Sequence, residues 1–275
     1  MGRALAPDPS PVRYGVLADI HGNLHALEAT LRLFEREEVD GYLCAGDLVG
    51  YGPFPNECVE LVSSLKPLCV MGNHDLMALD RLSEDDCIPL AQTTMRWTRT
   101  VLSDASRDYL EGLPPRATLD GVVVAHGSLE DSTYYVATAP EAARELDRLR
   151  SQEPHAEVLI LGHTHRHAMF EQASGRLRAP GEAGVSLPRE RGPFLLNPGS
   201  VGQARERRAR ARCMLLDLDR REATFHAVAY DMSGCLRALR DQGLPPNACH
   251  LPPSASQTAR RLLRHSRDVV LGSRR

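Results

Sequence analysis

A short apolar run that ends at a glycine and is followed by polar residues is the feature that most constrains this chain. It is clearest in Val158–His165, where Val-Leu-Ile-Leu ends at Gly162 and His163-Thr164-His165 follow. A short apolar run bounded by a turn signal is typical of a buried strand. The same pattern occurs at five other places, and each is followed by an Asp, Asn or His side chain. The sequence therefore predicts several strands whose ends carry polar groups to one common site.

Composition limits the classes of protein that need to be considered. The chain has 275 residues, of which 42% are hydrophobic and 25% charged, as in an ordinary soluble globular protein. Its net charge of -3 gives no global reason to expect nucleic acid or an anionic membrane as a partner. No apolar stretch approaches the ~18 residues of a membrane span, and the N-terminus has no signal-peptide core. The seven scattered cysteines form no C-x-x-C pair and are expected to be buried in a reducing compartment. A cytoplasmic enzyme is expected.

The order of predicted elements favours an α/β fold. Predicted strands lie at Tyr14–Ala18, Gly41–Ala45, Pro67–Met71, Gly121–Ala125, 158–161 and Phe194–Leu196, and Met169–Gln172 with Leu177 is typical of a hairpin. Amphipathic helices follow several of them. Cys213–Leu218 and Ala223–Tyr230 are two strands with only a charged turn between them. An antiparallel element after a series of β-α units favours two sheets with outer helices over one doubly wound sheet.

Residues 1–240 are predicted to form one domain. Within it, residues 76–115 interrupt the alternation with apolar side chains at helical spacing, which predicts a helical excursion over the site. Residues 241–275 are rich in proline and then in arginine. They are interpreted as a surface tail that ends in a short amphipathic helix or in disorder.

Seven polar side chains follow the predicted strands and are candidate metal ligands: Asp19, His21, Asp47, Asn73, His126, His163 and His165. Asp19 and His21 are two residues apart, and positions i and i+2 point the same way along a strand. Ligands of open α/β sheets collect beyond the carboxyl ends of the strands, so these groups are expected to meet. Each motif alone would be an ordinary turn or a core histidine; their joint occurrence favours a metal site.

The types of ligand indicate the kind of metal. Carboxylate, imidazole and amide groups without a thiolate suit Mn²⁺, Fe²⁺, Zn²⁺ or Co²⁺. Seven ligands are too many for one such ion. They predict two ions about 3.5–4 Å apart, bridged by a carboxylate, with Mn²⁺ favoured.

The motif series resembles that of the calcineurin-like metallophosphoesterases: Asp19-x-His21, Gly46-Asp47, Gly72-Asn73-His74-Asp75, His126-Gly127 and Gly162-His163-Thr164-His165. The resemblance spans about Val12 to Tyr230 and is closest to the small bacterial phosphodiesterase-like branch. It implies a four-layer α/β/β/α sandwich of two mixed sheets with outer helices. It also implies that Asp19, His21 and His165 hold one ion, that Asn73, His126 and His163 hold the other, and that Asp47 bridges them. The implied chemistry is in-line attack by a metal-bound hydroxide on a phosphorus centre.

Two residues beside the ligands are candidates for catalysis. His74 follows Asn73 and is the candidate general acid for the leaving oxygen, a role typically worth ~10²–10⁴ in rate. Asp75 either orients His74 or caps the helix that begins near Leu76.

Departures from the family pattern narrow the substrate. Phosphoprotein phosphatases of the superfamily follow the second motif with Asp-Arg, and symmetrical dinucleoside tetraphosphatases keep the arginine. Here Asp47 is followed by Leu48, Val49, Gly50 and Tyr51. The phosphate-gripping arginine and the aspartate that pairs with the catalytic histidine are both missing. The loss weakens recognition of a dianionic monoester more than of a diester. A small-molecule phosphodiester or nucleotide is therefore the favoured substrate.

Two alternatives stay open: a phosphoprotein or dinucleoside polyphosphate phosphatase, and a non-catalytic interaction module on the same fold. Tyr51 and Arg205 are the candidate substrate-binding residues. Arg205 opens an arginine-rich run, 205–212, that is expected near the mouth of the site. A solvated loop and strand edge is nevertheless the favoured interpretation of this run.

Overall fold

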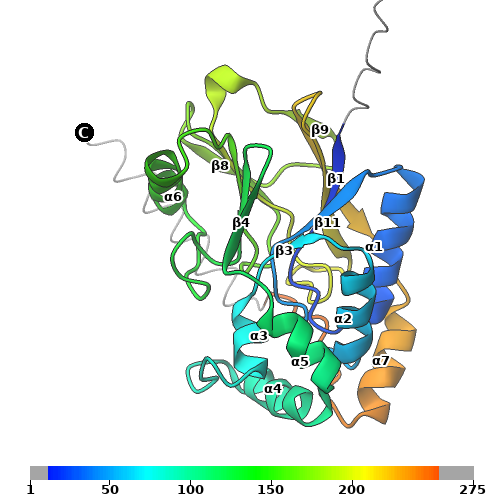
Figure 1. Ribbon diagram of the computed structural model, residues 1–275. Coiled ribbons are helices and arrows are strands. Elements are labelled where there is room, and N and C mark those ends of the chain that lie inside the picture. Colours follow the sequence, from blue (N-terminus) through cyan, green and yellow to red (C-terminus); the bar gives the residue numbers. More distant parts are fainter. Residues whose placement is uncertain (1–11, 254–275) are drawn as a thin grey trace, which may run out of the picture.

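Two six-stranded sheets form the centre of the computed structural model, which describes residues 12–253 (Figure 1). The strands of the first sheet, in spatial order, are β3 (Leu68–Cys69), β2 (Gly41–Cys44), β1 (Arg13–Leu17), β11 (Ala211–Asp217), β12 (Glu222–Val228) and β9 (Gly184–Ser186). Those of the second sheet are β4 (Arg116–Leu119), β5 (Val122–Ala125), β6 (Val158–Ile160), β10 (Phe194–Asn197), β7 (Ala168–Glu171) and β8 (Arg176–Arg178).

Both sheets are mixed, as the resemblance implied. Strands β1, β2 and β3 run parallel, and the antiparallel pair β11 and β12 extends their sheet. In the second sheet β5, β6 and β10 run parallel, and β7 and β8 form the predicted hairpin. Two groups of parallel strands therefore present their carboxyl ends, where sites in α/β sheets are built.

Helices cover the outer face of each sheet. Helices α1 (Leu24–Arg36) and α2 (Pro55–Ser64) pack on the first sheet, and α7 (Met232–Asp241) lies beside α1 (Figure 1). Helix α6 (Ala139–Gln152) covers the second sheet. No helix between residues 12 and 253 is long and apolar enough to cross a membrane. The helices and sheets form the four layers expected from the resemblance.

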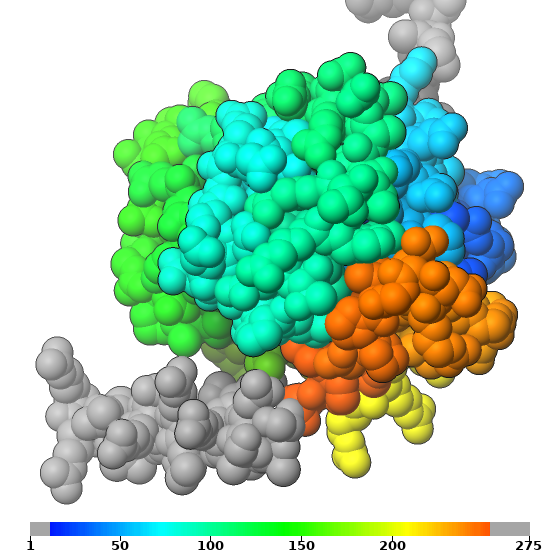
Figure 2. All heavy atoms as spheres, turned by 90° about the horizontal axis from the view of Figure 1, so that it is seen from below, coloured from blue at the N-terminus to red at the C-terminus, as the bar shows by residue number. Residues whose placement is uncertain are grey.

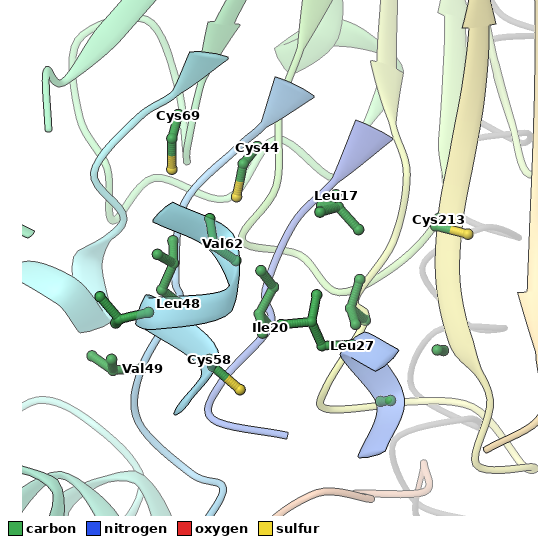
Figure 3. Close-up of a cluster of buried hydrophobic side chains, with 14 of the residues drawn as sticks. Leu17, Ile20, Leu27, Cys44, Leu48, Val49, Cys58, Val62, Cys69 and Cys213 are labelled. Carbon is green, nitrogen blue, oxygen red and sulfur yellow. The ribbon is translucent and has the colours of Figure 1, made fainter. Parts of the chain in front are cut away.

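Three apolar interfaces hold the four layers together. Figure 3 shows the interface between the first sheet and its helices, where Leu17 and Cys44 of the sheet face Leu27 of α1 and Val62 of α2. Side chains of both sheets fill a second interface between them, and α6 packs on the second sheet in the third. All seven cysteines are free, and six of them are buried. Their predicted use as small apolar side chains is confirmed.

Helix α1 illustrates how local sequence sets this packing. The Asn23 side chain accepts a hydrogen bond from the Ala26 N–H at 3.2 Å and so caps the first turn. The apolar stripe of the helix ends in Phe34, which is fully buried against β1. A Cβ atom at Gly15 would lie 2.6 Å from the Phe34 ring, so glycine is required there for the ring to fit.

The predicted helical excursion consists of α3 (Asn73–Ala78), α4 (Pro89–Val101) and α5 (Asp104–Glu111). These helices lie together at the end of the molecule where β3 leads into α3 (Figure 1). Arg99 joins them, since its guanidinium donates to both Glu84 carboxylate oxygens at 2.6–2.9 Å and to the Met77 carbonyl at 2.8 Å. Met95 of α4 is fully buried in the same apolar cluster as α2.

The interpretation of the chain from residue 241 onward as a surface tail is wrong for residues 244–249. Leu244, Ala248 and Cys249 are buried against Cys235 and Leu239 of α7. A tail with proline and few apolar residues gives no periodic signal, so this packing was not predictable from pattern. The basic stretch beyond residue 253 lies outside the described residues.

Replacing Leu244 by alanine tests this packing. The Leu244→Ala change removes a side chain that is 6% exposed, and we expect a loss of about 2–4 kcal/mol in the free energy of unfolding. Urea unfolding measures it, with Gln242→Ala, an exposed neighbour, as the control that shifts by less than about 0.5 kcal/mol. If neither change lowered the free energy of unfolding, the surface-tail interpretation would be restored.

Candidate metal centre

The polar residues that follow the strands lie in tight turns. Strand β1 ends at Leu17 and β6 at Ile160, so the first donors lie two to three residues beyond. Five of the donors have left-handed backbone: Asp19 (φ 53°), His21 (φ 49°), Asp47 (φ 58°), His163 (φ 64°) and His165 (φ 58°). The expectation that Asp19 and His21 point the same way because side chains alternate along an extended strand is therefore wrong. Asp and His tolerate this conformation better than most residues, at a cost of about 1–3 kcal/mol each.

Hydrogen bonds between the turns hold them in this conformation. The Asp19 N–H donates to the Gly46 carbonyl at 3.0 Å, and the His21 N–H to the Asp47 carbonyl at 2.9 Å. The Asp19 carboxylate in turn accepts from the His163 N–H at 3.0 Å. The Ser200 hydroxyl donates to the Asp19 carbonyl at 2.8 Å. Four turns far apart in the chain thus form one connected unit.

The seven candidate ligands meet in this unit. Ligand atoms of Asp19, His21, Asp47 and His165 lie within 4.8 Å of one another, and so do those of Asp47, His126 and His163. Asp47 belongs to both groups. Its Oδ2 atom is 3.6 Å from His21 Nε2 and 3.2 Å from His126 Nε2. The Asn73 Oδ1 atom lies 2.9 Å from His126 Nε2, which adds the seventh side chain. All seven are buried.

Backbone carbonyls fix which nitrogen of each histidine faces the centre. A carbonyl only accepts, so the ring nitrogen beside it must carry a proton, and in the neutral imidazole the other nitrogen keeps its lone pair. Three histidines contact a carbonyl oxygen through Nδ1, at 2.6–3.1 Å: His21 contacts Val49, His126 contacts Ala45 and His165 contacts Gln203. His163 instead contacts the Thr133 carbonyl through Nε2, at 3.0 Å. Such outer partners orient metal-binding histidines.

With all four histidines neutral, the inward-facing atoms are all acceptors, and this is the test of fit to a metal. Burial disfavours the charged His126 ring, but the Asp47 carboxylate outweighs burial and raises the pKa of His126 to about 10, so in the absence of a cation a proton takes its place on this ring. His21 Nε2 and His165 Nε2 are 3.1 Å apart, although each neutral ring carries its proton on Nδ1 and therefore has none on Nε2. The Oδ2 atoms of Asp19 and Asp47 are buried with no hydrogen-bond partner among the described residues. Buried acceptors without donors are unfavourable unless a cation compensates them. The donors present fit a dinuclear divalent metal site.

Burial and mutual charge set the ionisation of the centre. Burial raises the pKa of Asp19 to about 7, an effect that the His126 charge partly offsets. Burial also opposes ionisation of Asp47, but the charge of His126, whose own pKa is raised to about 10, outweighs it and holds the pKa of the Asp47 carboxyl well below its usual range. The shared carboxylate is therefore the ionised one, which suits a bridging position between cations.

His74 lies beside the bridging carboxylate. Its backbone N–H donates to Asp47 Oδ1 at 2.7 Å, and its ring is 4.7 Å from the His21 ring. A Cβ atom at Gly50 would lie 2.5 Å from His74 Nδ1, so only glycine leaves room for the imidazole. That nitrogen is buried and has no hydrogen-bond partner within residues 12–253. Burial lowers the pKa of His74 to about 4.

Asp75 has partners other than His74. Its carboxylate accepts from the backbone N–H groups of Asp47, Leu48, Val49 and Gly72 at 2.8–3.2 Å. In the contact with Gly72, Asp75 acts as the third residue of α3 and satisfies the N–H of the N-cap, so it supports the helix start from within, and the helix begins at Asn73 rather than near Leu76. The other contacts hold the turn that carries Asp47. No hydrogen bond joins Asp75 to the His74 ring among the described residues.

The two candidate substrate-binding residues have different surroundings. Tyr51 is only 2% exposed, and its ring lies 4.8 Å from those of His21 and His74. Arg205 lies at the edge of the centre, where its Nε donates to Gln203 Oε1 at 3.0 Å. The carbonyl of the same Gln203 orients His165. Arg205 is thus linked to a candidate ligand through one residue.

Tyr135 and Gln203 were not predicted from the sequence. The Tyr135 ring is 4.0 Å from that of His163, and its side chain is 48% exposed. Burial opposes the charge of Arg205, and the nearby Tyr135 hydroxyl is one of the groups that nevertheless raise the pKa of Arg205. Tyr135 lies in a loop without periodicity, whereas Gln203 follows Asn197-Pro198-Gly199-Ser200, one of the recognised strand ends, and that position could have suggested it.

Comparisons with known proteins agree with this geometry. Residues 12–167 match the family described as calcineurin-like phosphoesterase. A metallophosphoesterase from Sphaerobacter thermophilus is 32% identical, with a TM-score of 0.75 over 87% of this chain and 97% of that one. A hypothetical protein from Pyrococcus horikoshii shares the fold at 20% identity and a TM-score of 0.67, over 86% and 96% of the two chains.

A relative of unknown activity extends the similarity beyond residue 167. An uncharacterized protein of Methanocaldococcus jannaschii is 28% identical over 234 residues, which are 84% of this chain and 93% of that protein. The family match itself covers more than half of the 275 residues. The chain belongs to the calcineurin-like phosphoesterase family and is a metal-dependent phosphoester hydrolase.

Proposed function

We propose that this enzyme hydrolyses small phosphodiesters or nucleotides. The observation that carries the proposal is the surroundings of His74. Leu48, which follows Asp47, is fully buried in the apolar core, and Gly50 packs directly on the imidazole. Neither position offers an arginine to a phosphate or a carboxylate to His74. A phosphate monoester with two charges needs such bidentate cationic contacts more than a singly charged diester does.

The proposed metal ligands follow the two groups of donors. Asp19, His21 and His165 would hold one ion, Asn73, His126 and His163 the other, and Asp47 would bridge them. Oxygen and nitrogen donors without thiolate support Mn²⁺, Fe²⁺, Zn²⁺ or Co²⁺, and Mn²⁺ is the native metal in this proposal. When bound, two such ions supply Lewis acidity that neutralises phosphoryl charge and makes a nucleophile available near pH 7.

His74 is proposed to donate the proton to the leaving oxygen. Its Nδ1 is enclosed beside Gly50, so Nε2 is the atom that would meet substrate. Tyr51 is a positioning residue in this proposal, because it is buried and its ring packs on that of His74. Asp75 acts on the turn that carries Asp47 and contacts no substrate.

Relative rates on simple substrates test the choice of ester. With Mn²⁺ added, we expect kcat/KM for bis-p-nitrophenyl phosphate to exceed that for p-nitrophenyl phosphate by about tenfold, as one lost charged contact predicts. A higher value for the monoester would contradict the diester preference. Hydrolysis of neither ester by metal-loaded protein would contradict the function as a whole.

Metal analysis of an Asp47→Asn variant tests the bridge. The wild type is expected to hold two divalent ions per chain, and the variant less than one, since an amide gives up the shared negative charge. Elemental mass spectrometry measures the content, and turnover should fall at least ~10²-fold in parallel. Asp120→Asn, at an exposed aspartate that is also left-handed (φ 49°), is the matched control. Full metal content in Asp47→Asn would exclude bridging.

The variants His74→Ala and Asp75→Ala should distinguish a catalytic residue from one that stabilises the turn carrying Asp47. The first variant is expected to lose ~10²–10⁴ in kcat while it keeps its metal content. The second leaves backbone N–H groups without their acceptor, so its free energy of unfolding should fall by at least about 2 kcal/mol. Urea unfolding and metal analysis distinguish them. A stable, metal-loaded Asp75→Ala enzyme with lost kcat would instead make Asp75 part of the chemistry.

A further inference from the structure

A groove of about 1150 Å³ lies beside the metal centre and is lined mainly by arginine. Two glutamates accompany its six arginines: Arg166, Arg205, Arg207, Arg208, Arg210 and Arg212. Most of them belong to the segment that precedes β11. Figure 2 shows the face where this yellow segment, around residues 200–210, projects beside the orange segment of α7. The net charge of the whole chain is -3, so this positive charge is a local feature.

Glu206 neutralises only one wall of the groove. Glu206 binds Arg212 through two hydrogen bonds of 2.6 and 3.0 Å and also lies 3.3 Å from His167 Nδ1. Arg207 and Arg208 are exposed, and Arg210 is half-buried. Within residues 12–253 no ion pair or hydrogen bond engages the side chains of these three. Their guanidinium groups are available to an anion.

Two arginines of the groove lie next to the metal centre in the chain or through one hydrogen-bonded residue. Arg166 directly follows the candidate ligand His165, and it lines the groove. Arg205 lines it too, and Gln203 connects Arg205 to His165: its side chain accepts from Arg205, and its carbonyl accepts from the His165 ring. A phosphate at the metal centre would therefore have its neighbouring groups at the entrance of the groove.

We propose that this arginine groove binds further phosphate groups of the substrate, next to the phosphate that is cleaved. The assignment rests on the proposed phosphoesterase function and adds to it a substrate with successive phosphates. Guanidinium forks match phosphate oxygens in a bidentate way, and a single diester would not engage several of them.

The lining favours a condensed phosphate chain over a nucleic-acid strand. Proteins that bind single strands stack the bases on aromatic side chains. Apart from His167, which is held by Glu206, no aromatic residue lines the groove within the described part of the chain. A chain of phosphates needs only positive charge, and that is what the groove provides.

Calorimetry on the full-length protein as purified tests the groove without any turnover. The probes are inorganic phosphate and a triphosphate analogue whose bridging oxygens are methylene groups, so that it cannot be hydrolysed. We expect the analogue to bind at least about tenfold more tightly than phosphate. In the combined Arg207→Ala, Arg208→Ala and Arg210→Ala variant, the Kd of the analogue should rise by about tenfold, and that of phosphate by less than twofold.

The control carries the same change of charge at another place. Arg36, Arg237 and Arg240 are exposed on α1 and α7, and their combined replacement by alanine should leave the Kd of the analogue within twofold. Equal weakening by both triple variants would overturn the proposal, because net charge alone would then explain binding. Equal affinity of the wild type for both probes would also overturn it.

A phosphorothioate thymidine oligonucleotide of the same charge distinguishes the source of the phosphates. Weaker binding than the triphosphate analogue supports the condensed chain, and tighter binding that depends on the three arginines overturns that assignment. Failure of the enzyme to hydrolyse any ester would refute the proposed function but would leave these Kd values unchanged. The two proposals can therefore fail separately.

Discussion

The structure depends on a convergence of buried carboxylates and imidazoles that have too few protein donors to pair with. When the histidines are neutral, two carboxylates and four imidazole lone pairs face one another, and Asp19 Oδ2 and Asp47 Oδ2 have no hydrogen-bond partner among the described residues. Removing such groups from water costs several kcal/mol each unless an opposite charge is supplied. Because the donors come from turns of both sheets, a cation bound there stabilises the meeting of the sheets as well as the site. Metal binding and folding would thereby be coupled.

Backbone groups, rather than other side chains, keep the donors in place. Each histidine is fixed by a carbonyl of a different turn, and Asp75 binds four backbone N–H groups. Five donors also adopt left-handed backbone, a strained state that persists only where neighbouring bonds enforce it. The turns are thus determined by long-range hydrogen bonds, and the side chains in them can be selected for chemistry.

The contrast between local sequence signals and long-range hydrogen bonds explains what could be predicted from the sequence. The strands and their ligands carry a local signal, an apolar run that ends at glycine, and the seven donors do meet. β9 carries no such signal, since it has three residues and exists only because β12 pairs with it. Strand β4 is half-exposed. Helix α7 does carry apolar side chains at helical spacing, but the burial of Cys235 and Leu239 by the segment after residue 243 has no local signal. Tyr135 reaches His163 from an irregular loop, which no periodicity reveals.

The electrostatic potential around the metal centre indicates a role for the arginine run 205–212 that composition alone did not indicate. The carboxylates of the centre would by themselves repel a phosphate ester, so the potential must become positive before substrate can bind. Two divalent ions would reverse the sign at the centre, and their effect on exposed charges falls off over about 8–10 Å in physiological salt. Arginines along the groove extend the positive potential beyond that distance, from Arg205 outward. A long anionic substrate would then meet attraction along its whole length, whereas a neutral surface would hold only the phosphate at the metals.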